Sequence, residues 1–143
     1  VEEYIDTWKD LAIAKMKKHG IPASIILAQA SLESGNGTST LTRNGKNHFG
    51  IKCHGWKGKR SYHNDDTKNE CFRNYETDEA SFEDYCLFLK KNQRYDFLFD
   101  LDRTDYNAWV KGLKKAGYAT DDHYINKLIK RIETYNLNKF DHE

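Results

Sequence analysis

The stretch from Ile25 to Leu32 reads IILAQASL and leaves almost no polar face if it is helical. A helix that is apolar all round is buried in the centre of a domain rather than laid on its surface. The run ends on Glu33 and continues with Ser-Gly-Asn-Gly, a sequence that stops a helix. The sequence therefore predicts a central buried helix that ends at about Glu33, around which the other elements must pack.

Helical periodicity recurs on both sides of this segment. Apolar residues at spacings of three and four predict a helix over residues 2–19, which Gly20 stops. After residue 75 the pattern predicts three more helices, and each follows a residue whose side chain can cap a helix N-terminus. The expected caps are Thr77 for the first, Asp105 for the second, and Asp121 or Asp122 for the last.

The segment from residue 47 to residue 75 has no helical period and is rich in aromatic, Gly, Asp and Asn residues. We expect a small β-hairpin here, with strands near 60–64 and 70–75. The chain of 143 residues has no internal repeat or linker, and it is long enough to bury a stable core without depending on disulfide bonds or metal ions. The predicted fold class is mainly α (α+β), with one domain over residues 1–143 and a β-lobe at about 53–75.

Charge and hydropathy exclude two classes of partner. The 23 Lys and Arg residues nearly balance the 22 Asp and Glu residues, which argues against a nucleic-acid binder. No apolar stretch is long enough to span a membrane. Because Val1 already opens a predicted helix and no signal peptide is present, we expect a targeting segment to have been removed.

The three cysteines leave the redox compartment open. Cys53 and Cys71 flank the loop-rich segment and would form a disulfide in an exported protein, whereas all three thiols would be reduced in the cytosol. Cys86 falls within a helical pattern and is expected to be a buried thiol. The spacings of Cys53, His54, His63 and Cys71 match no paired metal-ligand pattern, so we predict no metal and no cofactor. A cysteine–histidine peptidase is disfavoured because Cys53 lacks a setting that lowers a thiol pKa.

Glu33 is the residue whose position suggests chemistry. Burial of the helix and the negative end of the helix dipole both raise the pKa of a carboxyl group at this place. An acid that keeps its proton near neutral pH is what a glycosidase uses to protonate a leaving oxygen. Glutamates are also common at helix ends, where they point into solvent, so the spacing alone leaves both interpretations open.

The segment ILAQASLESGNGTSTLTRNGKNHFGIKC resembles the core motif of glucosaminidase-type peptidoglycan hydrolases, glycoside hydrolase family 73. The likeness continues through GWKG, ECFRNY, DEASFEDY and LKKAGYATDDHYINKLIKRIETYNL, in that order along most of the chain. The resemblance implies a lysozyme-like fold and a glycoside hydrolase. It also implies cleavage of the β-linkage between N-acetylglucosamine and N-acetylmuramic acid in peptidoglycan glycan strands, with Glu33 as general acid.

A second carboxylate is expected in the β-lobe, because such hydrolases use one to activate water or to stabilise an oxocarbenium-like transition state. The resemblance implies a Glu just before the hairpin turn, and this chain departs from that pattern. It offers Asp65, Asp66 and Glu70 instead, with the two aspartates on opposite faces of the turn approach. Asp and Asn also favour turns for backbone reasons, and substrate-assisted catalysis would make the second acid unnecessary.

Aromatic and amide side chains near the lobe are candidates for sugar binding. Aromatic rings stack on the apolar faces of sugars, and the same rings also serve core packing. Tyr118 matches the tyrosine of the family's GYATD motif, while His48 departs from the aliphatic residue usual after the motif asparagine. The predicted substrate-binding residues are Asn47, Phe49, Trp56, Tyr62 and Tyr118.

The resemblance implies an exported protein, periplasmic or associated with the cell wall, and we expect it to act as a monomer. Two other functions remain open. The absence of the usual lobe glutamate is compatible with a wall-binding module that has lost turnover. A lytic transglycosylase of similar fold would use one acid and yield an anhydro-sugar.

Overall fold

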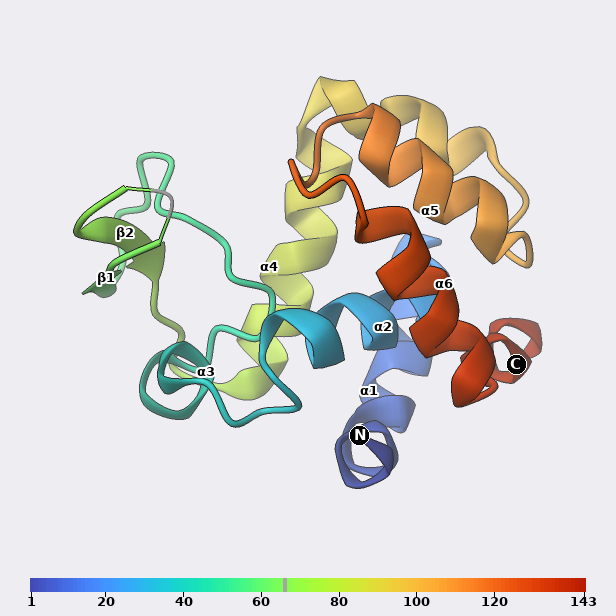
Figure 1. Ribbon diagram of the computed structural model, residues 1–143, viewed down its shortest axis with the longest axis horizontal. Helices are drawn as coiled ribbons and strands as arrows, with labels where there is room; N and C mark the ends of the chain where they lie inside the picture. Colours follow the sequence, from blue (N-terminus) through green and yellow to red (C-terminus); the bar gives the residue numbers. More distant parts are fainter. Residues whose placement is uncertain (66) are drawn as a thin grey trace.

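The structure is a computed structural model that describes residues 1–65 and 67–143. Helices dominate, and a two-stranded antiparallel sheet stands apart from them (Figure 1). The predicted fold class, mainly α with a small β-hairpin lobe, is confirmed. The α-helices are α1 (Glu2–His19), α2 (Ala23–Glu33), α3 (Thr40–Gly45), α4 (Asp78–Lys91), α5 (Tyr106–Lys115) and α6 (Tyr124–Thr134). The strands are β1 (Arg60–His63) and β2 (Glu70–Arg73), and the 3-10 helices are η1 (Gln93–Asp100) and η2 (Leu137–His142).

Helix α2 occupies the centre of the helical body, as its apolar sequence predicts. It packs against α1, α5, α6 and η2 (Figure 1), and every residue from Ala23 to Ser31 is buried. Its few polar side chains have buried partners, as polar groups in a core require. The Ser24 hydroxyl donates to Asp141 over 2.5 Å, and the Gln29 amide donates to the Tyr124 hydroxyl over 2.5 Å.

The end of α2 shows why a Ser-Gly-Asn-Gly sequence follows Glu33. The backbone enters the left-handed region at Gly35, Asn36 and Gly37, with φ of 58°, 58° and 82°. Glycine and asparagine tolerate this region, whereas most side chains clash with the backbone there. Arg131 of α6 fixes the turn by donating to Ser31 and Asn36 over 3.0 Å each. The helix therefore stops abruptly, and Glu33 is held at a fixed position on its last turn.

The predicted caps hold for two of the three later helices. Thr77 accepts from the Ala80 amide over 3.0 Å at the start of α4, and Asp105 accepts from the Ala108 amide over 3.1 Å at the start of α5. The third prediction is wrong, because α6 begins at Tyr124 with His123 as its N-cap residue. Asp121 instead accepts from the His123 amide over 2.9 Å and forms the turn that precedes the helix.

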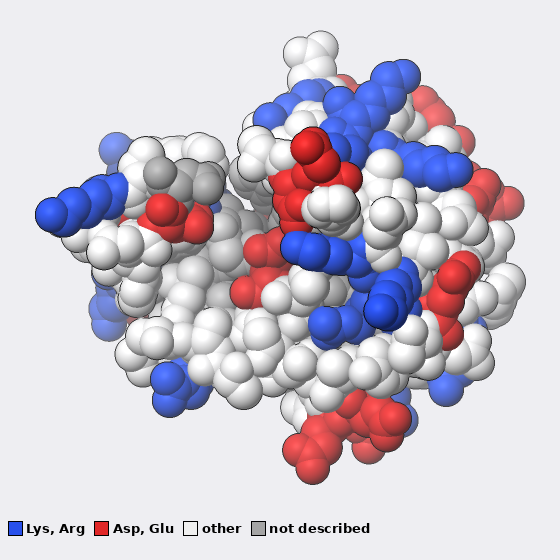
Figure 2. Space-filling model, viewed as in Figure 1, with Lys and Arg blue, Asp and Glu red and all other residues white. Residues whose placement is uncertain are grey.

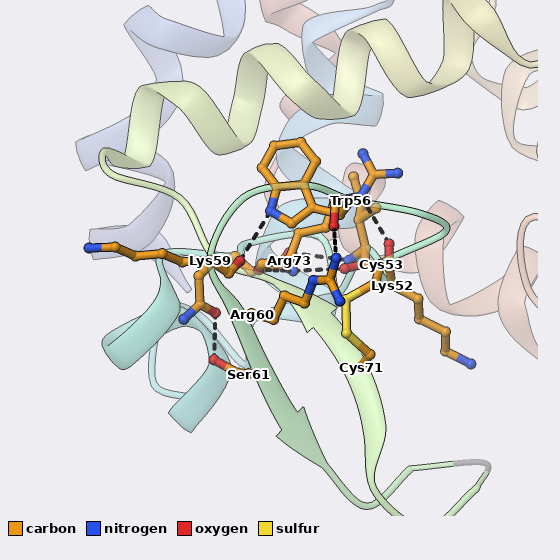
Figure 3. The surroundings of a disulfide bond; sticks show 11 residues. Lys52, Cys53, Trp56, Lys59, Arg60, Ser61, Cys71 and Arg73 are labelled. Atoms are coloured by element: carbon orange, nitrogen blue, oxygen red, sulfur yellow. Dashed lines mark hydrogen bonds between the residues drawn. A yellow bond between two sulfur atoms is a disulfide. The ribbon is translucent and has the colours of Figure 1, made fainter.

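The β-lobe is a short hairpin fastened by a covalent bond. Strands β1 and β2 pair from Arg60 with Arg73 to His63 with Glu70, one or two residues shorter than predicted. Cys53 and Cys71 form a disulfide with a Cα–Cα distance of 5.5 Å (Figure 3), which settles the question that the sequence left open. Cys86 is a buried free thiol, as predicted.

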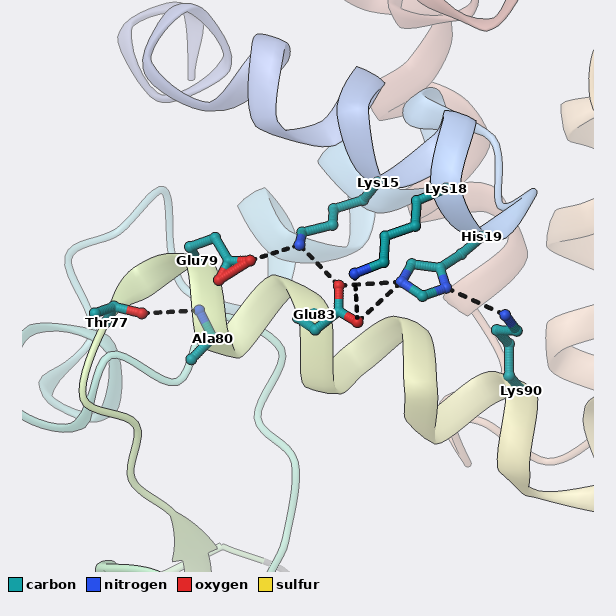
Figure 4. Close-up of polar contacts among 8 residues, drawn as sticks. All are labelled: Lys15, Lys18, His19, Thr77, Glu79, Ala80, Glu83 and Lys90. Atoms are coloured by element: carbon teal, nitrogen blue, oxygen red, sulfur yellow. Dashed lines mark hydrogen bonds and ion pairs between the residues drawn. The ribbon is translucent and has the colours of Figure 1, made fainter.

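An ion-pair cluster joins α1 to α4 (Figure 4). The Lys15 ammonium lies 2.6 Å from Glu79 and 2.7 Å from Glu83, and the Lys15 side chain is only 8% exposed. Glu83 also contacts Lys18 at 3.3 Å and His19 at 3.0 Å. The cluster therefore fixes the two helices against each other.

In the part of the chain that the structure describes, no helix combines the length and apolar character needed to cross a bilayer.

Candidate active site

A cleft of about 560 Å³ lies between the β-lobe and the helical body. Figure 2 shows this hollow with acidic side chains on both of its walls. One wall comes from the end of α2, the start of α6 and the loop between α5 and α6, and the other comes from the lobe and the segment that leads into it. The lining residues include Glu33, Phe49, Gly50, Lys52, His54, Asp65, Phe88, Arg94, Tyr95, Tyr118, Asp121, Tyr124 and Lys127.

Glu33 lies in this cleft, not on an outer surface. Its side chain keeps contact with solvent, unlike the fully buried residues before it, and its carboxylate makes no hydrogen bond or ion pair with any described residue. The enclosing walls nevertheless desolvate it, and this raises the pKa of Glu33 to about 7. The charge of Asp65 raises the pKa further, while Lys127 opposes both effects. The carboxyl group therefore holds its proton for part of the time at neutral pH.

The loop that faces Glu33 is held by Asn47. Gly50 adopts φ 65°, and a Cβ atom added to it would lie 3.6 Å from the Glu33 Oε2. Asn47 donates to the carbonyl groups of Ile51 and Arg73 over 3.0 and 2.9 Å and accepts from the Ile51 amide over 3.2 Å. Asn47 is buried and does not line the cleft, so it positions the loop from beneath instead of facing the cleft itself.

The three lobe carboxylates predicted as partners of Glu33 differ in position. Asp65 lines the cleft, and its carboxylate lies 4.0 Å from the Lys52 ammonium. Glu70 lies on β2 outside the cleft lining, where it contacts Lys52 at 3.2 Å and accepts from Thr67 over 3.1 Å. Asp66 lies outside the described residues. Of the two described candidates, only Asp65 shares the cleft with Glu33.

The predicted aromatic residues also separate into two groups. Phe49 and Tyr118 line the cleft. Phe49 is almost fully buried and stacks on Tyr85 with ring centroids 4.0 Å apart, so little of its surface is free for a sugar. Trp56 and Tyr62 are not brought into the cleft: the Trp56 ring packs beside Arg73, whose guanidinium carbon is 5.0 Å from the ring centroid, and Tyr62 is 58% exposed.

Several cleft residues escaped sequence reasoning. Tyr124 is buried on α6 and would be taken for a core residue, yet it lines the cleft. It also ends a hydrogen-bond chain, in which Tyr85 donates to Gln29 and Gln29 donates to Tyr124. Its ring stacks on Tyr118 at 6.2 Å. Arg94 and Tyr95 come from η1, an element that the sequence pattern did not reveal. Tyr124 had a signal, because it stands within the quoted AGYATDDHYINK motif.

A helical body and a small β-lobe that face each other across a cleft, with carboxyl groups on both walls, define a lysozyme-like glycoside hydrolase domain. The glucosaminidase family, described as mannosyl-glycoprotein endo-beta-N-acetylglucosaminidase, matches residues 9–137, and the chain belongs to this family. The resemblance seen in the sequence is thereby confirmed.

Named relatives agree with this assignment. The peptidoglycan hydrolase FlgJ of Vibrio parahaemolyticus is 32% identical over 141 residues, covering 90% of this chain and 46% of that protein. A crystal structure of a peptidoglycan hydrolase from Sphingomonas sp. A1 aligns with a TM-score of 0.83 at 29% identity, over 98% of this chain and 92% of that one. The glycoside hydrolase domain of Salmonella typhimurium FlgJ aligns with a TM-score of 0.78 at 29% identity, over 94% and 87%. The chain spans about half the length of the curated relatives that it matches.

Proposed function

We propose that residues 1–143 form one catalytic domain that cleaves the β-glycosidic bond between N-acetylglucosamine and N-acetylmuramic acid in peptidoglycan, with Glu33 as general acid. The observation that carries the proposal is the place of Glu33: a helix-end carboxyl group in an open cleft, with its pKa raised to about 7. Membership of the glucosaminidase family and the printed names of the relatives support the same substrate class.

The proposed chemistry begins with the protonated form of Glu33. This acid donates its proton to the glycosidic oxygen as the bond to the leaving sugar breaks, which is the step that a raised pKa favours. Asp65 faces the same cleft and is proposed as the second carboxylate, which stabilises the positive charge that develops on the sugar or orients the attacking water. Glu70 is less suited, because it lies outside the cleft lining and contacts Lys52.

Substrate contacts are assigned by access to the cleft. Tyr118 is the stronger candidate for a sugar contact, because it lines the cleft and is only partly buried. Phe49 shapes the cleft from a mostly buried position, and Asn47 acts by holding the loop that carries Gly50. Trp56 and Tyr62 would contact only a glycan strand that extends past the cleft onto the lobe.

The proposed site of action is outside the cytoplasm. The Cys53–Cys71 disulfide is of the kind that persists in oxidising compartments, and the names of the relatives point to wall hydrolases. Action as a monomer remains a prediction.

Mass spectrometry of digested, purified peptidoglycan tests the function, with Glu33→Gln compared with wild type. The substitution keeps the shape and removes the proton donor, so muropeptide release is expected to fall by about 10²–10⁴-fold. Glu76→Gln is the matched control, because Glu76 is 81% exposed and outside the cleft lining.

The products distinguish the alternatives. A hydrolase adds one water at each cleavage, whereas a lytic transglycosylase yields an anhydro-sugar lighter by that water. Binding to insoluble wall without any soluble product would identify a binding module instead. Release by Glu33→Gln at the wild-type rate would refute the role of Glu33.

A further inference from the structure

Two hydrogen-bond donors, Arg94 and Tyr95, lie side by side in the lining of the cleft. Tyr95 is fully buried, lines the cleft, and has a hydroxyl group that meets no acceptor among the described residues. The guanidinium carbon of Arg94 lies 4.8 Å from the Tyr95 ring centroid, and Arg94 forms no ion pair with a described carboxylate. A guanidinium can only donate, so the hydroxyl hydrogen of Tyr95 is left without an acceptor. Buried polar groups normally have partners, which makes this vacant donor informative.

Three basic side chains also line the cleft, and His54 lies close enough to Lys52 and Arg94 to sense the charges of both. Lys52, His54 and Arg94 all line it, and they come from the segment before the hairpin and from the start of η1. The pKa of His54 is lowered by burial, and then by the charges of Arg73, Lys52 and Arg94. Glu70 opposes this effect, and Lys52 is ion-paired with Glu70 at 3.2 Å and with Asp65 at 4.0 Å.

An apolar ring lies between two of these donors. The His54 ring lies 6.1 Å from the ring of Phe88, which lies 5.9 Å from that of Tyr95. Phe88 also lines the cleft. Low-dielectric surface of this kind strengthens a charged hydrogen bond made next to it.

We propose that Arg94 and Tyr95, with His54 beside them, form a subsite that binds a carboxylate group of the substrate. The planar fork of Arg94 matches the two oxygens of a carboxylate, and the Tyr95 hydroxyl supplies a further donor. The inference rests on the proposed function and makes it more specific: the enzyme would select glycan that carries carboxylates. In peptidoglycan these belong to the stem peptide, or to the lactyl group of muramic acid once its peptide is removed. Oligomers of N-acetylglucosamine carry none.

Binding measured without turnover tests the subsite. Isothermal titration calorimetry on Glu33→Gln protein would compare three soluble ligands: peptide-bearing glycan, the same glycan after amidase treatment, and an N-acetylglucosamine oligomer of equal length. Arg94→Gln and Tyr95→Phe are added to this background. Lys91→Gln is the matched control, because it removes an exposed cation near η1 that does not line the cleft.

Arg94→Gln is expected to raise the Kd of carboxylate-bearing glycan about tenfold, since one charge-assisted hydrogen bond is lost. Tyr95→Phe should raise it about threefold, by loss of one neutral hydrogen bond. Both should leave the Kd of the N-acetylglucosamine oligomer within about twofold, and Lys91→Gln should leave all three ligands unchanged. If amidase treatment abolishes the sensitivity to Arg94→Gln, the carboxylate is that of the stem peptide; if the sensitivity appears only after the treatment, it is that of the freed lactyl group.

Equal weakening of charged and neutral ligands by Arg94→Gln, or no weakening of either, would overturn the subsite. The failure of the subsite and the failure of the function are separable. If the protein releases muropeptides but shows no Arg94-dependent preference for carboxylate-bearing glycan, the subsite is refuted and the hydrolase function stands. If binding depends on Arg94 but the wild-type protein releases no muropeptides, the subsite stands and the hydrolase function is refuted.

Discussion

The helical body and the β-lobe each present a carboxylate to the same cleft, but they are held together in different ways. The body is built around α2, whose residues from Ala23 to Ser31 are all buried. The lobe has two strands of four residues, and of these only Phe72 is buried. It is fastened by the disulfide and by Arg73, which donates to Asp84 of α4 over 2.9 Å.

This difference separates the two acids. The position of Glu33 depends on packing around α2, so it is as stable as the whole body. The position of Asp65 depends on one covalent bond and a few polar contacts near the hairpin. We therefore expect damage to the body to unfold the protein, and damage to the lobe to remove activity while the helices remain folded.

The largest effect should come from truncating the core beneath Glu33. Leu27→Ala removes a fully buried side chain from α2 and is expected to lower the free energy of unfolding by about 2–5 kcal/mol. Urea unfolding followed by far-ultraviolet circular dichroism measures this loss. Phe72→Ala is the matched truncation in the lobe, and it should leave the helical transition within about 1 kcal/mol of wild type while reducing muropeptide release. If both variants shift the helical transition equally, body and lobe unfold as one unit.

The sequence predicted the body better than the lobe, for a physical reason. The apolar run of α2 is compatible only with a buried helix, and the glycines that follow Glu33 end that helix. Capping side chains gave the starts of α4 and α5, because those bonds are local. The start of α6 was misplaced because Asp121 bonds to the turn before the helix, a choice that local pattern does not decide.

The cleft was only partly predictable, because residues from distant segments meet there. Glu33 and Tyr118 could be placed from motif and helix position, and Asp65 from the hairpin turn. Whether Trp56 reaches the cleft depends on its packing against Arg73, which spacing does not show. Arg94 and Tyr95 belong to a 3-10 helix, a short element whose period differs from the α-helical period sought in the sequence.

Removing the disulfide tests the lobe directly. The Cys53→Ala/Cys71→Ala variant loses a crosslink between residues separated by 18 positions, which is worth about 3 kcal/mol of loop-closure free energy. We expect faster proteolysis between the two positions and reduced muropeptide release, with unchanged helical dichroism. Adding dithiothreitol to wild type should reproduce this result, while the double variant should not respond to the reagent. Wild-type activity in the double variant would show that polar contacts alone hold the lobe.

A smaller effect is expected at the ion-pair cluster that joins α1 to α4. Burial by itself raises the pKa of Glu83, but hydrogen bonds from its basic partners outweigh burial and lower the pKa to about 2. Glu83→Gln should cost about 1–3 kcal/mol of stability at neutral pH, because Lys15 loses one of its two acids. Because the pKa of Glu83 is lower in the folded protein, its charged form stabilises the fold at pH values above the ordinary Glu pKa. This stabilisation is lost as the pH falls toward 2, so the cost of Glu83→Gln should shrink in acid.

Thermal melts at pH 7 and pH 3 measure this cost. The control is Glu76→Gln, whose exposed pair with Lys59 at 3.6 Å should be worth less than about 0.5 kcal/mol. A loss for Glu83→Gln no greater than that of the control would mean that the cluster does not fix α1 against α4.

The smallest effect concerns the pH at which activity declines. Activity should fall as the pH rises through about 7, because Glu33 then loses the proton that it donates. The negative charge of Asp65 raises the pKa of Glu33 and the positive charge of Lys127 lowers it. Asp65→Asn should therefore move the alkaline limb of kcat/KM to lower pH, and Lys127→Gln should move it to higher pH, each by about 0.5 unit or less because salt screens both charges.

The position of the limb is informative even if Asp65→Asn also lowers the rate, because a limb is defined by shape and not by amplitude. Reducing the disulfide should move the limb in the same direction as Asp65→Asn, since a released lobe takes the Asp65 charge away from Glu33. It should not change the direction of the Lys127→Gln shift, because Lys127 belongs to α6 in the body. A limb unmoved by all three changes would mean that another group, and not Glu33, controls the alkaline side of the profile.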